Sequence, residues 1–265
     1  MNNEHWRWNS NITWHYFSSM YHETHCALNA NNDFMKYHHR RSALYYAVGT
    51  IESYLNSERR KFLENAGTEE SQIQKQLKDT RLPDKRKKWP EEMYWSNFHL
   101  DDGIIQIFEK YAKDRNEITH PKNRDHSIYA ELDNMDDIAL RDSVAKSLVS
   151  LHAAKNTPFP YWVLGWNFVG MNNNPAYPFE GNVHNGFLHS LQAMGYRVPA
   201  SDYGRAKTWV EANMTTVAGY ENLKKVLDAY PHDIEPCSEW LPMKPRLCRR
   251  WWDDQFILST VPSQD

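Results

Sequence analysis

The sequence predicts a mainly all-α protein: an antiparallel helical bundle with a mostly helical C-terminal extension. Apolar residues recur every three to four positions over most of residues 11–155, which is the spacing of helices with one buried face. Only one stretch, residues 161–169, has the composition of a β-strand. The 265 residues are 40% hydrophobic and carry a net charge of −3, which is typical of a globular protein with ample core.

The first two predicted helices lie near the N-terminus. Residues 11–30 contain neither proline nor glycine and have apolar residues at helical spacing. Asn32 or Asp33 is expected to cap a long second helix that runs to about Asn65, and Gly67 is expected to end it. The apolar stripe of this second helix comprises Phe34, Tyr37, Leu44, Tyr45, Val48, Ile51, Leu55 and Phe62.

A polar, basic segment follows over residues 66–92. Pro83 and Pro90 bracket its cations, so we expect a loop or a frayed helix end there. A run of cations attracts nucleic acid regardless of sequence, and in a slightly acidic protein such contact has to come from a local patch. The predicted RNA-binding residues are Lys85, Arg86, Lys87 and Lys88. The alternative is that this segment is only a solvated part of the surface.

A third long apolar-periodic stretch begins near Asp101 and ends in Arg115-Asn116-Glu117-Ile118-Thr119-His120, with Pro121 after it. Apolar residues at helical spacing start at about residue 91, and Gly103 is expected to interrupt the helix. Pro121 disfavours helical geometry at His120, so this motif is expected to lie at a break between two helices. A further amphipathic helix is predicted over residues 134–154.

The motif combines three side chains that suit work on a phosphodiester. Arg115 offers a planar fork of donors that matches phosphate oxygens. His120 can accept and donate protons near neutral pH, and Asn116 can hydrogen-bond without titrating. Positions five apart on one straight helix point about 140° away from each other. Arg115 and His120 therefore need the helix break, or the two-fold symmetry of a dimer, to meet in one site.

The pattern R-N-x-x-x-H at a helix break, after an earlier helix that contains residues 42–56, resembles the HEPN superfamily. The resemblance covers roughly residues 30–155 and implies a HEPN-like helical bundle over residues 1–155. It implies a metal-independent endoribonuclease with no cofactor, in which the ribose 2′-hydroxyl attacks the adjacent phosphate and leaves a 2′,3′-cyclic phosphate. Arg115, Asn116 and His120 would be its catalytic residues, and Glu52 a supporting residue that orients Arg115 or His120.

The resemblance also implies partners. Sites in this family are commonly composite, so a homodimer that cleaves RNA is expected. Family members often act as toxins with an antitoxin protein or in phage defence. One variant of the family has a tyrosine two residues after the histidine, which a partner enzyme adenylylates. Here that position is Lys122, so this mode of control is not expected.

Two other functions remain open from the sequence. The chain could be a non-catalytic helical module that binds RNA or a protein, with Arg115 and His120 in structural roles. It could instead be a metal-dependent hydrolase that uses histidines outside the motif. That third interpretation is weaker, because the spacing of these histidines matches no usual ligand set. They are His22, His25, His38 and His39.

Residues 156–265 form the predicted C-terminal extension. It is rich in proline and glycine at first, and residues 161–169 are expected to form a strand or a buried loop. Short helices are predicted at about residues 183–194, 202–213 and 219–230. Near the C-terminus, residues 245–252 mix cations with aromatic residues. Such a mixture suits stacking on bases, or a tail that docks on the bundle, which we favour.

Several features predict a cytoplasmic location. No apolar run approaches the roughly 20 residues that span a bilayer. The first residues of the chain lack the apolar segment of a signal peptide. The three cysteines, Cys26, Cys237 and Cys248, form neither a metal-spaced pair nor an even disulfide set.

Overall fold

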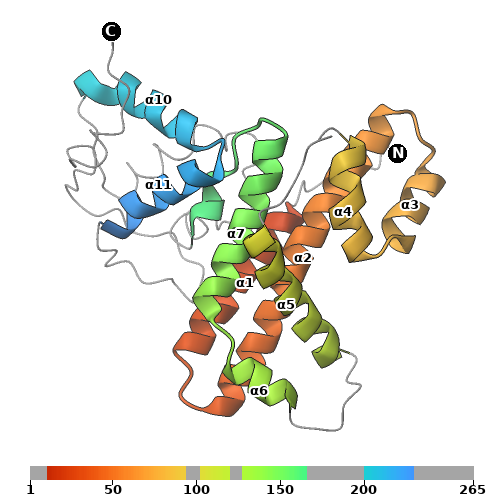
Figure 1. Ribbon diagram of the computed structural model, residues 1–265, viewed down its shortest axis with the longest axis vertical. Helices are drawn as coiled ribbons and strands as arrows, with labels where there is room; N and C mark the ends of the chain where they lie inside the picture. The colour runs from red at the N-terminus through yellow and green to blue at the C-terminus, as the bar shows by residue number, and fades with distance from the viewer. Residues whose placement is uncertain (1–10, 94–101, 120–126, 166–199, 230–265) are drawn as a thin grey trace, which may run out of the picture.

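The computed structural model describes residues 11–93, 102–119, 127–165 and 200–229 (Figure 1). Every regular element within these residues is a helix, which confirms the predicted all-α class. The α-helices are α1 (Ile12–Leu28), α2 (Asp33–Asn65), α3 (Glu70–Asp79), α4 (Leu82–Met93), α5 (Asp102–Thr119), α6 (Ser127–Asp133), α7 (Asp137–Ala154), α10 (Tyr203–Asn213) and α11 (Val217–Ala229). Two 3₁₀ helices, η1 (Tyr161–Leu164) and η3 (Ala200–Asp202), complete the list.

The first two helices form an antiparallel hairpin, as the sequence predicts. The side chain of Asn11 accepts a hydrogen bond from the backbone of Trp14 at 2.9 Å and caps α1. Asn32 caps α2 in the same way, accepting from Met35 at 2.9 Å. After α2, Gly67 takes a φ of 73°, a left-handed conformation that glycine adopts at little cost. Local capping signals therefore set the ends of this long helix.

Gly49 permits a close approach between α1 and α2. A Cβ atom at this position would lie 3.0 Å from Cδ2 of the Tyr16 ring on α1. We therefore expect Gly49→Val to lower the free energy of unfolding by about 1–3 kcal/mol, because its branched side chain overpacks this contact. Gly204, in the first turn of α10, has no heavy atom within 4 Å of such a Cβ, so Gly204→Val is the matched control.

Urea denaturation of both variants measures this difference. The control should stay within about 0.5 kcal/mol of the wild type, since valine and glycine differ little in helix propensity at an exposed site. Equal stability of the two variants would show that the α1–α2 contact yields easily at Tyr16.

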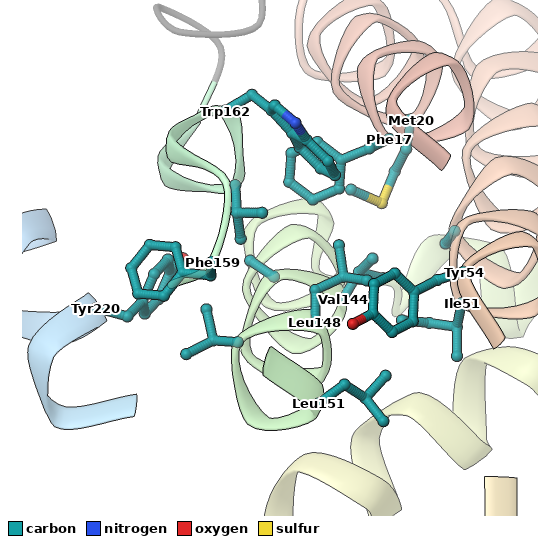
Figure 2. Close-up of a cluster of buried hydrophobic side chains, with 14 of the residues drawn as sticks. Phe17, Met20, Ile51, Tyr54, Val144, Leu148, Leu151, Phe159, Trp162 and Tyr220 are labelled. Carbon is teal, nitrogen blue, oxygen red and sulfur yellow. The ribbon is translucent and has the colours of Figure 1, made fainter. Parts of the chain in front are cut away.

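The hydrophobic core joins α1, α2, α5 and α7 with parts of the extension. Figure 2 shows side chains from α1, α2, α7 and the extension in one cluster, to which Phe108 and Tyr111 of α5 also belong. Phe17 of α1 packs against Trp162 of η1 with ring centroids 4.9 Å apart. Phe159 packs edge-on against Tyr220 of α11 at 6.0 Å. Aromatic rings thus tie the extension to the bundle.

Polar contacts also cross residue 155, the predicted boundary between bundle and extension. The backbone N–H of Phe159 donates to the carbonyl oxygen of Met214 at 2.8 Å. Lys146 of α7 forms an ion pair with Glu221 of α11 at 3.1 Å. The described part of the extension therefore shares one core with the bundle.

The basic segment differs from its prediction as a loop or frayed end, because residues 70–79 and 82–93 form α3 and α4. Pro83 falls in the first turn of α4, where its missing N–H costs no hydrogen bond. Pro90 lies inside the helix and is buried with Trp89 and Met93. Burial of this face against α2 holds the helix in spite of its internal proline.

The other predicted elements agree in part. Helices α10 and α11 confirm those predicted at 202–213 and 219–230. Residues 161–164 form a buried 3₁₀ turn, so the strand alternative is wrong there. Gly103 lies in the first turn of α5 and does not interrupt it. His120, residues 166–169, the helix predicted at 183–194 and residues 245–252 lie outside the described residues. Among the helices described, none is long and apolar enough to cross a membrane.

Candidate functional site

The last two turns of α5 place the first half of the motif. The described part of α5 runs to Thr119, and His120 lies outside the described residues, so the predicted helix break at the motif stays a prediction. Arg115 lies two turns after Phe108, which is 2% exposed and part of the core. The Arg115 side chain is accordingly half-buried, whereas Asn116 points to the exposed side of the helix. Arg115 is therefore packed partly against the bundle, and the Asn116 amide faces solvent.

Two titratable groups beside Arg115 have raised pKa values. The Tyr111 hydroxyl donates to the carbonyl oxygen of Asp136 at 3.0 Å. Burial, with a smaller contribution from Asp136, raises the pKa of Tyr111 to about 12. Burial also raises the pKa of Asp114, and the negative charge of Glu131 on α6 adds to this effect. Both shifts have burial of this part of α5 as their main cause.

Helix α6 is the next described element after α5, and a buried arginine fixes it to α2. Arg40 donates to the Asp137 carboxylate from Nε at 3.1 Å and from Nη2 at 2.8 Å. Its Nη1 donates to the carbonyl oxygens of Leu132 and Asp133 at the end of α6. We call this set of contacts the Arg40 clamp. It ties the end of α6 and the start of α7 to α2.

Glu52, the predicted supporting residue, lies at the contact between α2 and α4. Its carboxylate accepts a hydrogen bond from Lys85 Nζ at 2.8 Å, and Asn56 Oδ1 accepts another from the same amine at 2.9 Å. Lys85 is 2% exposed and lies over the Trp89 ring at 5.3 Å. Glu52 is therefore engaged in joining α4 to α2, whereas Arg115 lies on the last turns of α5 beside α6.

The four predicted RNA-binding cations divide into two pairs. Lys85 and Arg86 point inward, and the Arg86 guanidinium bonds to Glu109 of α5 and lies 5.3 Å from the centre of the Phe108 ring. Lys87 and Lys88 are exposed, and Lys88 pairs with Asp84 at 3.1 Å. Because α4 is a helix with one buried face, Lys85 and Arg86 lie on the side that faces the bundle, and Lys87 and Lys88 lie on the side that faces solvent. Lys87 and Lys88 are the two that solvent, or RNA, can reach.

The histidines considered for a metal site make other contacts. His22 Nε2 lies 3.6 Å from the Cys26 sulfur, and His39 Nδ1 lies 2.8 Å from Glu23 Oε2. His38 is in edge contact with the His39 ring at 5.3 Å. Within the described residues, no three side chains of His, Cys, Asp or Glu are placed to hold a metal ion together.

Sequence reasoning missed α6 and the Arg40 clamp. Arg40 bonds to a carboxylate 97 positions away in the chain. On α2 it follows His39 and precedes Arg41, so it resembles any solvated cation in the sequence. No local pattern distinguishes it.

Comparison of the chain with protein-family models, with curated proteins and with solved structures gave no match. The resemblance to the HEPN superfamily therefore depends on the motif at Arg115–His120 and on the helical bundle that carries it.

Proposed function

We propose that the protein is a metal-independent endoribonuclease of the HEPN type. The observation that carries this proposal is the position of Arg115 and Asn116 at the end of α5. Arg115 is half-buried, Asn116 faces solvent, and His120 follows the last described residue of α5, Thr119, in the sequence. A phosphodiester at this end of the bundle would meet a fixed cation, an amide and an imidazole.

In the proposed reaction the ribose 2′-oxygen attacks the neighbouring phosphorus. A new P–O2′ bond forms and the P–O5′ bond breaks, which leaves a 2′,3′-cyclic phosphate and a 5′-hydroxyl. His120 takes the proton from the 2′-hydroxyl or supplies one to the leaving 5′-oxygen. Arg115 stabilises the charge that builds on the phosphoryl oxygens. Asn116 positions His120 or the scissile phosphate. The proposal needs no metal and no cofactor.

The spacing of the motif favours a composite site. Arg115 is on the core-facing stripe of α5, and positions five apart on one straight helix point about 140° away from each other. A second copy of the chain would supply its own Arg115 and His120 opposite the first pair, so that one histidine acts as base and the other as acid. The proposed partners are therefore RNA and a second protomer. Lys87 and Lys88 would add attraction for the RNA backbone.

A cellular role as a toxin or a phage-defence effector belongs to the same proposal, with an antitoxin protein as a further partner. An endoribonuclease that needs no metal would be active once its dimer has formed, so a cell would have to restrain it. The proposed location of this activity is the cytoplasm.

Incubation of the purified protein with single-stranded RNA in the presence of EDTA tests the proposal. We expect cleavage that leaves 2′,3′-cyclic phosphate ends, which mass spectrometry of the products identifies. RNA that is bound but not cut would instead favour the non-catalytic RNA-binding module. Activity that EDTA abolishes would favour the metal-dependent hydrolase.

A further inference from the structure

Large apolar side chains are exposed at one end of the bundle. Among the residues that the structure describes, seven large apolar side chains are exposed, and five of them lie at this end. Figure 1 shows the turn between α1 and α2, helix α6 and the start of α7 together there. We call these five residues the apolar end. They are Leu28 (53% exposed), Phe34 (74%), Met35 (40%), Tyr129 (46%) and Ile138 (57%).

Direct contacts join the elements that carry the apolar end. Tyr37, one turn after Phe34 on α2, has its ring 5.3 Å from the ring of Tyr129 on α6. Ile138 follows Asp137, which the Arg40 clamp ties to α2. Phe34, Tyr129 and Ile138 therefore flank one contact between α2, α6 and α7, and they present a surface that the packing of these helices holds in place.

Carboxylates stand beside these apolar side chains. Asp33 directly precedes Phe34 in the first turn of α2. Asp136 caps α7, and its side chain accepts a hydrogen bond from the backbone N–H of Ile138 at 2.9 Å. Both residues are exposed, as is Asp133 at the end of α6. The apolar end thus has exposed negative charge on each of the three helices that meet there.

The Tyr37 hydroxyl lies within this negative charge. It is 2.9 Å from each of the two carboxylate oxygens of Asp133. This hydrogen bond raises the pKa of Tyr37, and burial and the charges of Asp133 and Asp33 raise it further. Among the described residues of the turn, of α6 and of the first turns of α2 and α7, Lys36 is the one lysine or arginine, and it is half-buried. The charge around the apolar end is therefore mainly negative.

The size of the apolar end suits a single helix better than a whole folded surface. A fully exposed large side chain offers on the order of 200 Å², so these residues expose roughly 500 Å². Exposed apolar patches of several hundred Å² often mark interaction sites. Two folded proteins in a stable complex usually each bury about 800 Å². A helix that lays one apolar stripe on its partner can do so on a smaller area.

The charge selects the kind of helix. A second copy of this surface would bring carboxylates against carboxylates under two-fold symmetry, which is unfavourable. A helix with lysines or arginines beside its apolar stripe would instead place cations opposite Asp33, Asp133 and Asp136. Apolar contact and charge complementarity would then act on the same partner.

We propose that the apolar end binds a basic amphipathic helix of another protein. The apolar stripe of that helix would cover the apolar end, and its cations would face the three carboxylates. The inference does not depend on the proposed function, because it uses neither Arg115 nor His120.

Fluorescence anisotropy with the full chain tests the proposal. The probe is a labelled peptide of about 18 residues, five helical turns, made of leucine and lysine with the leucines on one face. A second peptide has the same composition in an order that gives no apolar face. We expect the amphipathic peptide to bind at least about tenfold more tightly than the reordered one, because only the first presents a continuous apolar stripe.

Two double variants test the apolar contact. Phe34→Ser/Ile138→Ser should weaken binding of the amphipathic peptide at least about tenfold, because it removes two exposed side chains from the apolar end. The fold should tolerate this change, since both side chains are mostly exposed. The matched control is Ile12→Ser/Tyr45→Ser, which changes the two other exposed large apolar residues (48% and 56% exposed) and should bind within about threefold of the wild type.

A second pair of variants tests the charge. Asp33→Asn/Asp136→Asn should weaken binding at least about threefold at low salt, and asparagine can still cap α7 at position 136. Glu69→Gln/Glu91→Gln is its control, because it removes two exposed carboxylates at α3 and α4 and should change binding less than about twofold.

Three results would overturn the proposal. One is equal binding of the two peptides, which would mean that charge alone attracts them. Another is equal binding by Phe34→Ser/Ile138→Ser and its control. The third is a wild type that sediments as a dimer which Phe34→Ser/Ile138→Ser dissociates, since a second copy would then occupy the apolar end. Cleavage of RNA enters none of these measurements, so the proposed function can fail while this inference holds.

Discussion

The substitution Arg40→Met is expected to lower the free energy of unfolding by about 3–5 kcal/mol. Arg40 is 7% exposed and Asp137 is 2% exposed, so the substitution leaves a buried carboxylate without its cation. The carbonyl oxygens of Leu132 and Asp133 lose their donor as well. The cost is larger than for a surface ion pair because solvent does not replace the lost partner.

The loss should depend on pH. Burial already raises the pKa of Asp137, and the hydrogen bond and charge of Arg40 oppose that rise. Without Arg40 the pKa in the folded state rises further above the unfolded value of about 3.9. A carboxyl group whose pKa is higher in the folded state than in the unfolded state destabilises the folded state as the pH rises through its folded pKa. Arg40→Met should therefore be least destabilised near pH 4 and most destabilised near pH 8.

Urea denaturation at fixed protein concentration measures both effects. Arg60→Met is the control, because Arg60 pairs with Glu70 at 2.9 Å on the surface and should contribute less than about 1 kcal/mol. The double variant Arg40→Met/Asp137→Asn removes both charges and should recover about 1–2 kcal/mol of the loss. If Arg40→Met and Arg60→Met cost the same, the buried pair does not hold α6 in place.

The second large effect concerns RNA cleavage. His120→Ala should lower kcat by about 10²–10⁴-fold, because it removes a proton-transfer group. Arg115→Ala should lower kcat by about 10²–10³-fold, because it removes a cation placed for the transition-state charge. In both variants we expect kcat to fall more than KM rises, since these groups act mainly on the transition state.

Controls of the same residue types exclude a general effect of losing charge. Arg60→Ala and His38→Ala remove an arginine and an exposed histidine of α2, a different helix from the one with the motif. Both variants should keep wild-type kcat. Circular dichroism should show all four variants folded. Unchanged kcat in Arg115→Ala or His120→Ala would mean that the motif does not catalyse the cleavage.

Local chemistry made the long helices predictable. Asn32 and Gly67 delimit α2 through side-chain capping and a left-handed backbone, both of which depend on residues close in sequence. Helix α4 was not predictable in this way. Its prolines and cations indicate a loop, and only contacts with distant Glu52 and Asn56 show why Lys85 can be buried in a helix.

In the candidate site, too, the sequence predicts the features that depend on neighbouring residues and not those that depend on contacts between distant residues. The half-buried position of Arg115 and the exposure of Asn116 follow from the apolar spacing of α5. The roles assigned to Glu52 and Arg86 depended on nearness in three dimensions, and both residues make contacts between helices that the spacing does not reveal.

The most direct test of the central claim uses an RNA with a single 2′-deoxy nucleotide at a cleaved linkage. If the ribose 2′-oxygen is the nucleophile, the wild type in EDTA will cut the other linkages to 2′,3′-cyclic phosphates and leave the deoxy linkage intact. Cleavage at the deoxy linkage would show that another nucleophile attacks the phosphorus, and would contradict the mechanism proposed for Arg115 and His120.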